Sequence, residues 1–201
     1  YDIFELDDNK VGVLIGDVVG KGLTAAILVA SARYAVRSYA YLDPSPSRVM
    51  TLVNDALCKE GTDANNVLTA FYAVVDTSNG TMVYASAGHE PPVVCNNRGE
   101  VEELCVTGAM LGVIPGAKYR ECGRNLRRGD SFVMFTDGIT EARHDASILF
   151  DKEGVIEHLK KACDAQPDEI ASALLEAATL HAGGHLQDDA AIVVMGFEKG
   201  R

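Results

Sequence analysis

The chain has 201 residues and a formal net charge of −11, with 47% hydrophobic and 23% charged residues. That length is enough to bury a core without disulfides. A chain this acidic repels nucleic acids and anionic membrane surfaces, so we expect neither as a partner. No apolar run approaches the roughly 20 residues that a membrane-spanning helix needs, so we also expect no direct membrane contact and a cytoplasmic location.

The cysteines point to free thiols. Their number is odd and no two have the CxxC spacing, which argues against a disulfide framework and against a zinc knuckle. We expect reduced, mostly buried thiols in a cytosolic protein. The five residues are Cys58, Cys95, Cys105, Cys122 and Cys163.

The first part of the chain is predicted to form two strands and then two helices. Residues 1–6 and 11–16 have strand character around a polar turn. A long helix is expected from about Leu23 to about Tyr39, and a second from about Ser47. The apolar positions that give the first helix its 3.6-residue period are Leu23, Ile27, Ala30, Tyr34 and Ala35.

The rest of the chain is predicted to hold more strands and a second pair of helices. Strands are expected at 67–75, 81–87, 92–95, 101–105, 131–136 and 190–197, and helices at 152–163 and 168–182. Asn79-Gly80 between the first two of these strands is a strong hairpin signal. Hairpin-linked strands favour antiparallel sheets, so we expect an α+β sandwich of two sheets between helical layers.

Three short segments place an acidic residue where an apolar strand meets a turn. They hold Asp17, Asp137 and Asp188. Three carboxylates that converge would repel one another, and hard cations such as Mg²⁺ and Mn²⁺, which prefer oxygen ligands, remove that repulsion. A single Asp in such a place is usually just a turn residue, whereas three together favour a metal site.

The glycine-rich segment around Lys21 does not fit a phosphate-binding P-loop. The Walker A pattern requires Ser or Thr after GK, and position 22 is Gly. Gly20 and Gly22 fit a tight turn into the helix or a close approach to a metal. Two interpretations of Lys21 are equally good: it guides a phosphate group, or it is a solvated turn residue.

Four ordered motifs resemble the SpoIIE/RsbU branch of the PPM metal-dependent phosphatases. They are Gly16–Gly22 with Ala25-Ala26, Ala87–Pro92, Phe135–Glu141, and Asp188-Asp189 before an apolar strand. The resemblance implies an αββα four-layer sandwich of two mainly antiparallel sheets flanked by helices. It also implies a single domain over residues 1–201 whose N-terminal strand and first metal-site motif are truncated.

The resemblance assigns roles to individual residues. Asp17 is expected to bridge two Mn²⁺ or Mg²⁺ ions with the backbone carbonyl of Val18 as a further ligand, while Asp137 and Asp188 complete the first ion's shell. Asp189 is expected to be an outer-shell or structural residue. The metals would lower the pKa of a bridging water, and the resulting hydroxide would attack phosphorus directly, without a phospho-enzyme.

Two departures from the family pattern affect this assignment. The Asp that opens the family's first motif is expected upstream of Tyr1, which leaves the second metal site open. The eukaryotic relatives carry a His where this chain has Val19. His89 is a candidate replacement as general acid, although a structural histidine is at least as good an interpretation. Gly138 is a further candidate beside the metal or the substrate.

The sequence thus predicts a phosphoserine/phosphothreonine protein phosphatase. The resemblance implies a phosphorylated anti-anti-sigma (STAS-type) protein as substrate, an upstream sensor domain, and a role in sigma-factor regulation and stress response. The alternative is a non-catalytic pseudophosphatase that serves as a scaffold. Retained acids at positions 17, 137 and 188 argue against it, because a binding module has no physical need for mutually repelling carboxylates. The oligomeric state stays open.

Overall fold

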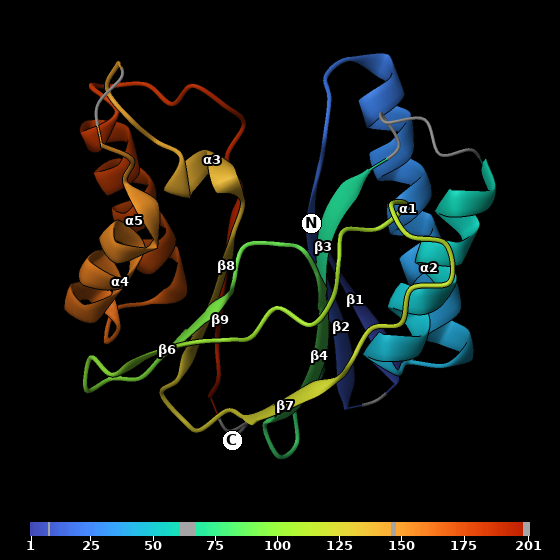
Figure 1. Ribbon diagram of the computed structural model, residues 1–201. Coiled ribbons are helices and arrows are strands. Elements are labelled where there is room, and N and C mark those ends of the chain that lie inside the picture. The colour runs from blue at the N-terminus through green and yellow to red at the C-terminus, as the bar shows by residue number, and fades with distance from the viewer. Residues whose placement is uncertain (8, 61–66, 146–147, 199–201) are drawn as a thin grey trace. The chain divides into compact units, whose positions relative to one another are not determined.

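The computed structural model describes residues 1–7, 9–60, 67–145 and 148–198 (Figure 1). The chain divides into two compact units. The first consists of Tyr1–His89 and Cys105–Leu126, and the second of Glu90–Leu104 and Arg127–Arg201. The chain therefore leaves the first unit, returns to it, and ends in the second.

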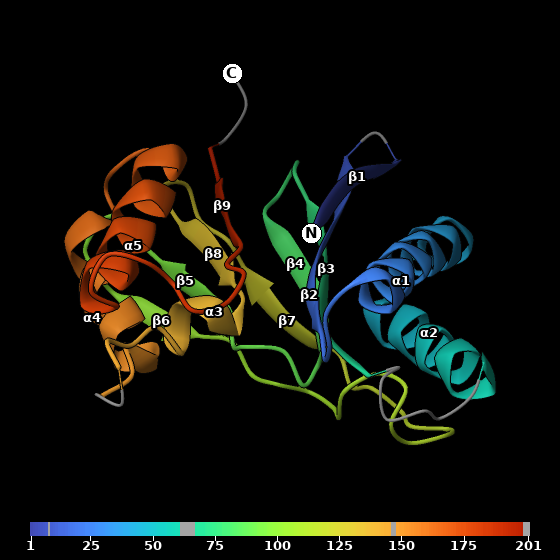
Figure 2. The same ribbon diagram turned by 90° about the horizontal axis from the view of Figure 1, so that it is seen from above.

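The first unit is an antiparallel five-stranded sheet with two helices on one face. Its strand order is β1-β2-β3-β4-β7. Figure 2 shows α1 and α2 side by side along the sheet. The elements are β1 (Asp2–Asp7), β2 (Lys10–Val18), α1 (Leu23–Leu42), α2 (Pro46–Glu60), β3 (Leu68–Asp76), β4 (Thr81–Ala87) and β7 (Cys122–Asn125).

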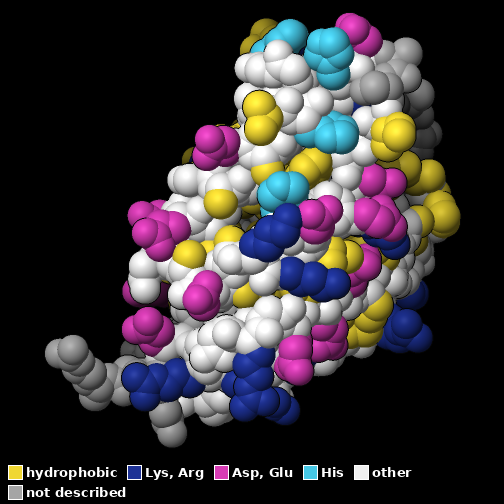
Figure 3. Space-filling view, turned by 90° about the vertical axis from the view of Figure 1, so that its left-hand side faces the viewer, with side chains coloured by type: hydrophobic (Ala, Val, Ile, Leu, Met, Phe, Trp, Pro, Cys, Tyr) yellow, Lys and Arg dark blue, Asp and Glu magenta, His cyan; other side chains and the backbone are white. Residues whose placement is uncertain are grey.

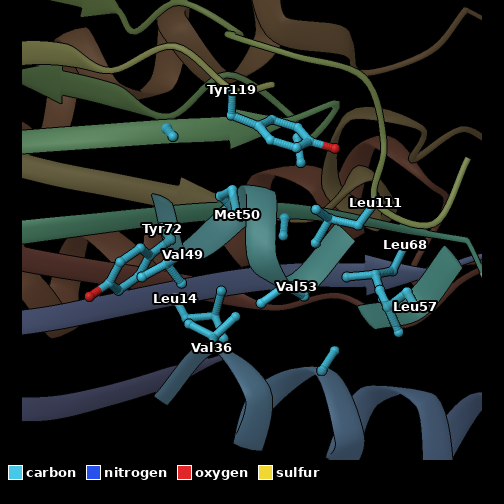
Figure 4. Packing of buried hydrophobic residues seen from close by; sticks show 14 of the residues in the cluster. Leu14, Val36, Val49, Met50, Val53, Leu57, Leu68, Tyr72, Leu111 and Tyr119 are labelled. Atoms are coloured by element: carbon cyan, nitrogen blue, oxygen red, sulfur yellow. The ribbon is translucent and has the colours of Figure 1, made fainter. Parts of the chain in front are cut away.

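The core of the first unit lies between this sheet and its helices. Val36 of α1 and Met50 and Val53 of α2 meet Leu14 and Tyr72 of the sheet (Figure 4). These side chains are buried, and burial of each large one contributes about 1.5–3 kcal/mol. β3 is buried on both alternating faces for most of its length, as the sequence predicts.

Most of the apolar residues from which α1 was predicted are not the residues that this helix buries. Leu23, Ile27 and Tyr34 are exposed. The helix is apolar on nearly every side, so its period predicts a helix without fixing which stripe faces the sheet. The buried stripe is Leu28, Ala32, Val36 and Ala40.

The second unit is an antiparallel four-stranded sheet with the order β6-β5-β8-β9. α4 and α5 pack against it, and their buried stripes include Val155, Leu159, Ile170 and Leu174. Figure 3 shows this helical side, where acidic and basic side chains are interspersed. The elements are β5 (Val93–Cys95), β6 (Val101–Glu103), β8 (Ser131–Phe135), α3 (Asp137–Thr140), α4 (Asp151–Ala162), α5 (Pro167–His181) and β9 (Ile192–Gly196).

The predicted α+β class with two antiparallel sheets and flanking helices is confirmed. Two elements were missed. β7 is short and polar, with no apolar alternation to indicate it, and α3 is one turn long, too short to show a helical period. None of the helices in the described ranges has the length and hydrophobicity to cross a bilayer.

Candidate functional site

Asp17 lies at the end of β2, opposite Thr69 of β3 in the antiparallel ladder. Its side chain is half-buried, and its Oδ1 accepts a hydrogen bond of 2.8 Å from the N–H of Val18. This local bond fixes the orientation of the carboxylate. The strand end thus presents Asp17 in a set direction, as predicted for a strand-end ligand.

The hydroxyl of Thr69 connects the backbone of Asp17 to His89. The N–H of Asp17 donates to Thr69 Oγ1 at 3.3 Å, and His89 Nδ1 lies 2.9 Å from the same oxygen. His89 is only 2% exposed. A buried histidine with this bond supports Thr69 and, through it, the backbone of Asp17, which fits the structural interpretation of His89.

Gly20 and Gly22 lie in the turn from β2 into α1 and adopt positive φ values of 124° and 87°. A Cβ at either position would meet nothing within 4 Å, so backbone conformation and not lack of space explains the glycines. Gly22 is the N-cap of α1. Lys21 between them is exposed, and both of its sequence interpretations therefore remain.

A pocket of about 350 Å³ lies next to Asp17 within the first unit. Gly16 and Asp17 of β2 line it, together with Ala26, Val29 and Arg33 of α1. Most of its wall is apolar. Asp17 therefore borders a space that solvent or a small ligand can enter.

Asp137 and Asp188 lie on neighbouring segments of the second unit. The antiparallel pairing of β8 with β9 ends at the pair Phe135 and Ile192. Just beyond, the N–H of Thr136 donates to the carbonyl of Ala191 at 3.1 Å, and the N–H of Ala191 donates to Thr136 Oγ1 at 2.9 Å. These bonds hold the start of α3 against the segment that leads into β9.

Gly138 is required where the two segments touch. A Cβ at this position would collide with the backbone carbonyl of Asp189. Only glycine permits this close approach without a shift of the backbone. This close contact brings the segments of Asp137 and Asp188 together, and the place of Gly138 beside the metal or substrate stays a prediction.

Asp188 is oriented locally in the same way as Asp17. Its Oδ1 accepts a hydrogen bond of 3.0 Å from the N–H of Asp189. Gln187 clamps the segment to the chain after α3, accepting from the N–H of Arg143 at 3.3 Å and donating to its carbonyl at 2.6 Å. The side chain of Asp189 is exposed, and its backbone orients Asp188.

Acidic side chains accumulate around Asp137. The pKa of Glu90 is raised, chiefly because the carboxyl is partly buried, and further by the charges of Asp137, Asp151 and Glu141. Such repulsion favours protonation or a bound cation. This concentration of oxygen donors suits a hard divalent ion.

The donor chemistry fits Mn²⁺ or Mg²⁺, since the candidate ligands are carboxylate oxygens. Within the described ranges, however, no three His, Cys, Asp or Glu side chains are arranged to hold an ion. Asp17 belongs to the first unit and Asp137 and Asp188 to the second. The ligand set predicted from the sequence therefore stays a prediction. Asp2 of β1 forms an ion pair of 2.8 Å with Arg37 of α1.

Sequence reasoning missed Thr69 and Glu90. Thr69 is recognised only through its register opposite Asp17, since the two are 52 residues apart in the chain. Glu90 could have been found, because it lies inside the Ala87–Pro92 motif directly after His89.

A family model for stage II sporulation protein E (SpoIIE) matches residues 7–198. Phosphoserine phosphatase RsbU of Bacillus subtilis (strain 168) is 30% identical over 199 residues, which cover 97% of this chain and 58% of RsbU. Protein IcfG of Synechocystis sp. is 27% identical over 94% of this chain and 34% of its own length. The chain thus spans little more than half of RsbU and about a third of IcfG.

Solved structures share the fold. The RsbU and RsbW domains of a Mycobacterium tuberculosis protein match with a TM-score of 0.84 and 21% identity, over 98% of this chain and 55% of that one. The SiaA-PP2C domain of Pseudomonas aeruginosa gives a TM-score of 0.84 and 21% identity, over 98% and 79%. A structure of RsbX in complex with magnesium gives 0.69 and 20%, over 96% and 83%.

Proposed function

Because this chain belongs to the SpoIIE family, we propose that it is a metal-dependent protein serine/threonine phosphatase. The observation that carries the proposal is its 30% identity to the phosphoserine phosphatase RsbU over 97% of the chain. Asp17 at the end of β2 and Asp188 in the loop before β9 support it, because in each a carboxylate oxygen accepts the N–H of the next residue, which orients an oxygen donor for a metal. The continuous match of residues 7–198 supports treating both units as one catalytic domain.

We assign Asp17, the backbone carbonyl of Val18, Asp137 and Asp188 as ligands of Mn²⁺ or Mg²⁺. When bound, the ions supply an activated water near neutral pH and neutralise charge on the phosphoryl oxygens. The magnesium in the RsbX structure and a structure of the SpoIIE phosphatase domain presoaked with manganese support a divalent ion.

Other residues of the chain hold the proposed metal ligands in position. Thr69 and His89 steady the backbone of Asp17, so His89 is a positioning residue and not the general acid. The close contact between Gly138 and the backbone carbonyl of Asp189 keeps the segments that carry Asp137 and Asp188 next to each other. No Ser or Cys nucleophile is needed, because water attacks phosphorus directly.

Lys21 is assigned as a guide for the phosphate group. It is exposed in the loop that follows Asp17 and carries a positive charge. Such a charge attracts a phosphorylated substrate without being part of the chemical step.

The substrate we propose is a phosphorylated regulatory protein of the anti-anti-sigma (STAS) type, in a cytoplasmic pathway that controls a sigma factor during stress. The RsbU relative and the matched RsbU and RsbW domains support a partner of this kind. An upstream sensor domain is part of the same proposal, and the greater length of the relatives supports it.

The experiment is phosphate release from a phosphoserine peptide and from p-nitrophenyl phosphate, with and without Mn²⁺. We expect turnover that depends on Mn²⁺ and stops on addition of a chelator. A protein that binds a phosphorylated STAS partner but shows no turnover, also when extended upstream of Tyr1, would identify the scaffold function instead.

A further inference from the structure

Two cysteines lie side by side at the edge of the first unit's sheet. The Sγ atoms of Cys105 and Cys122 are 2.8 Å apart. Tyr84 holds them together, because it pairs with Cys122 across β4 and β7 while its hydroxyl accepts a hydrogen bond of 3.2 Å from the N–H of Cys105. The sheet register therefore places Cys122, and the hydrogen bond to Tyr84 places Cys105 beside it.

The surroundings of Cys105 favour a reactive thiolate. Cys105 is exposed and Cys122 is half-buried. The pKa of Cys105 is lowered, first because the thiol of Cys122 and the hydroxyl of Tyr84 hydrogen-bond to its sulfur, and further by the nearby charge of Arg120. An exposed thiolate beside a second thiol is the usual setting of an oxidation-sensitive cysteine.

The other three cysteines lack this combination. Cys95 and Cys163 contact each other in the second unit, but both are buried. Burial raises the pKa of Cys58, as does the neighbouring Asp55. The chain thus contains one accessible thiol pair and one enclosed pair as an internal control.

We propose that Cys105 and Cys122 form a modification site at which a peroxide makes an intramolecular disulfide. The Cys105 thiolate attacks one peroxide oxygen, the O–O bond breaks, and Cys105 becomes a sulfenic acid while the other oxygen leaves as water or an alcohol. The Cys122 sulfur then attacks the Cys105 sulfur and displaces water. The dithiol loses two electrons and two protons, and the peroxide is reduced.

The disulfide encloses residues 106–121 in a covalent loop, and this loop packs against the start of β3. The N–H of Leu111 in this segment donates to the carbonyl of Leu68 at 2.9 Å. Leu68 precedes Thr69, so the cross-link restrains a segment next to the residue that supports Asp17. A reducing thiol reverses the step by thiol–disulfide exchange.

The test is mass spectrometry of the reduced protein after treatment with hydrogen peroxide, alkylation with iodoacetamide under denaturing conditions, and proteolysis. We expect two of the five cysteines to escape alkylation and a cross-linked peptide to join positions 105 and 122. Dithiothreitol should restore full alkylation. Cys122→Ser should instead accumulate a sulfenic acid at Cys105 that dimedone traps, and the control Cys163→Ser should cross-link like the wild type.

Three results would overturn the proposal: full alkylation after peroxide, a Cys95–Cys163 cross-link that forms first, or a disulfide that joins two chains through Cys105. The first two are read from peptide masses, the third from the mass of the intact unreduced protein, and none from turnover. The outcome is therefore independent of whether the chain is a phosphatase.

Discussion

The two units hold their acidic residues by different means. In the first unit, Asp17 lies at the end of a long ladder, and buried His89 supports it through Thr69. In the second unit, Asp137 and Asp188 depend on a close backbone contact at Gly138. Both Asp17 and Asp188 then use the same local device, a carboxylate oxygen that accepts the next residue's N–H.

This difference indicates where each half can tolerate change. Side-chain hydrogen bonds support the site in the first unit, so conservative substitutions there should shift metal affinity and leave the fold intact. Backbone packing supports it in the second unit, so even one added methyl group should cost stability. The five predictions below test and sharpen that contrast.

The largest effect is expected for Asp137→Asn. Losing the charge should lower Mn²⁺-dependent turnover by at least about 100-fold, the order found when one transition-state contact is removed. Hydrolysis of p-nitrophenyl phosphate measures this, with circular dichroism to check the fold. Asp164→Asn removes the same charge at an exposed site and should keep wild-type turnover. Near wild-type rates in Asp137→Asn would refute the metal assignment.

Gly138→Ala should destabilise the second unit. The new Cβ meets the carbonyl of Asp189, and overpacking of this kind costs about 2 kcal/mol, roughly a thirtyfold change in the folding equilibrium. Urea denaturation gives the free energy of unfolding. Gly123→Ala is the control, because its Cβ would meet only ordinary contacts. Equal stability of the two variants would contradict the role of Gly138.

Thr69→Val should weaken metal binding and spare the fold. The loss of the hydroxyl releases the backbone of Asp17, and removal of such a support raises the Mn²⁺ concentration for half-maximal activity about 10-fold. Thr69→Ser should behave like the wild type. An unchanged Mn²⁺ dependence in Thr69→Val would argue against positioning.

His89 gives a matched test of the same support. The side chain of His89→Asn can place a nitrogen or oxygen near the position of Nδ1, whereas that of His89→Leu cannot. We expect the Asn variant to keep most of the Mn²⁺ affinity and turnover. If both variants lost turnover equally while binding Mn²⁺ normally, His89 would be the general acid.

The smallest effect is expected for Lys21→Met. An exposed charge contributes little, so KM for a phosphoserine peptide should rise roughly threefold with kcat unchanged. Steady-state kinetics at two salt concentrations measures this. Identical KM values in the variant and the wild type would favour the solvated-turn interpretation.

The sequence predicts the helices and strands better than it predicts which distant side chains contact each other. Asn79-Gly80 indicated the β3–β4 hairpin, and the strand-end positions of Asp17 and Asp137 followed from apolar runs that stop at a turn. The Thr69–His89 bond was out of reach, because it depends on a register between distant strands. For the same reason, a cysteine count indicated unpaired thiols but could not show that Cys105 faces Cys122. The exposed state of Cys105 also differs from the mostly buried thiols expected.

Calorimetric titration with Mn²⁺ tests most directly whether acids from both parts of the chain serve one metal centre. The comparison needs the wild type, Asp17→Asn and Asp188→Asn, with Asp164→Asn as control. We predict that the wild type and the control bind Mn²⁺ and that either of the other two substitutions alone removes the binding. Wild-type affinity in Asp17→Asn or in Asp188→Asn would contradict the account.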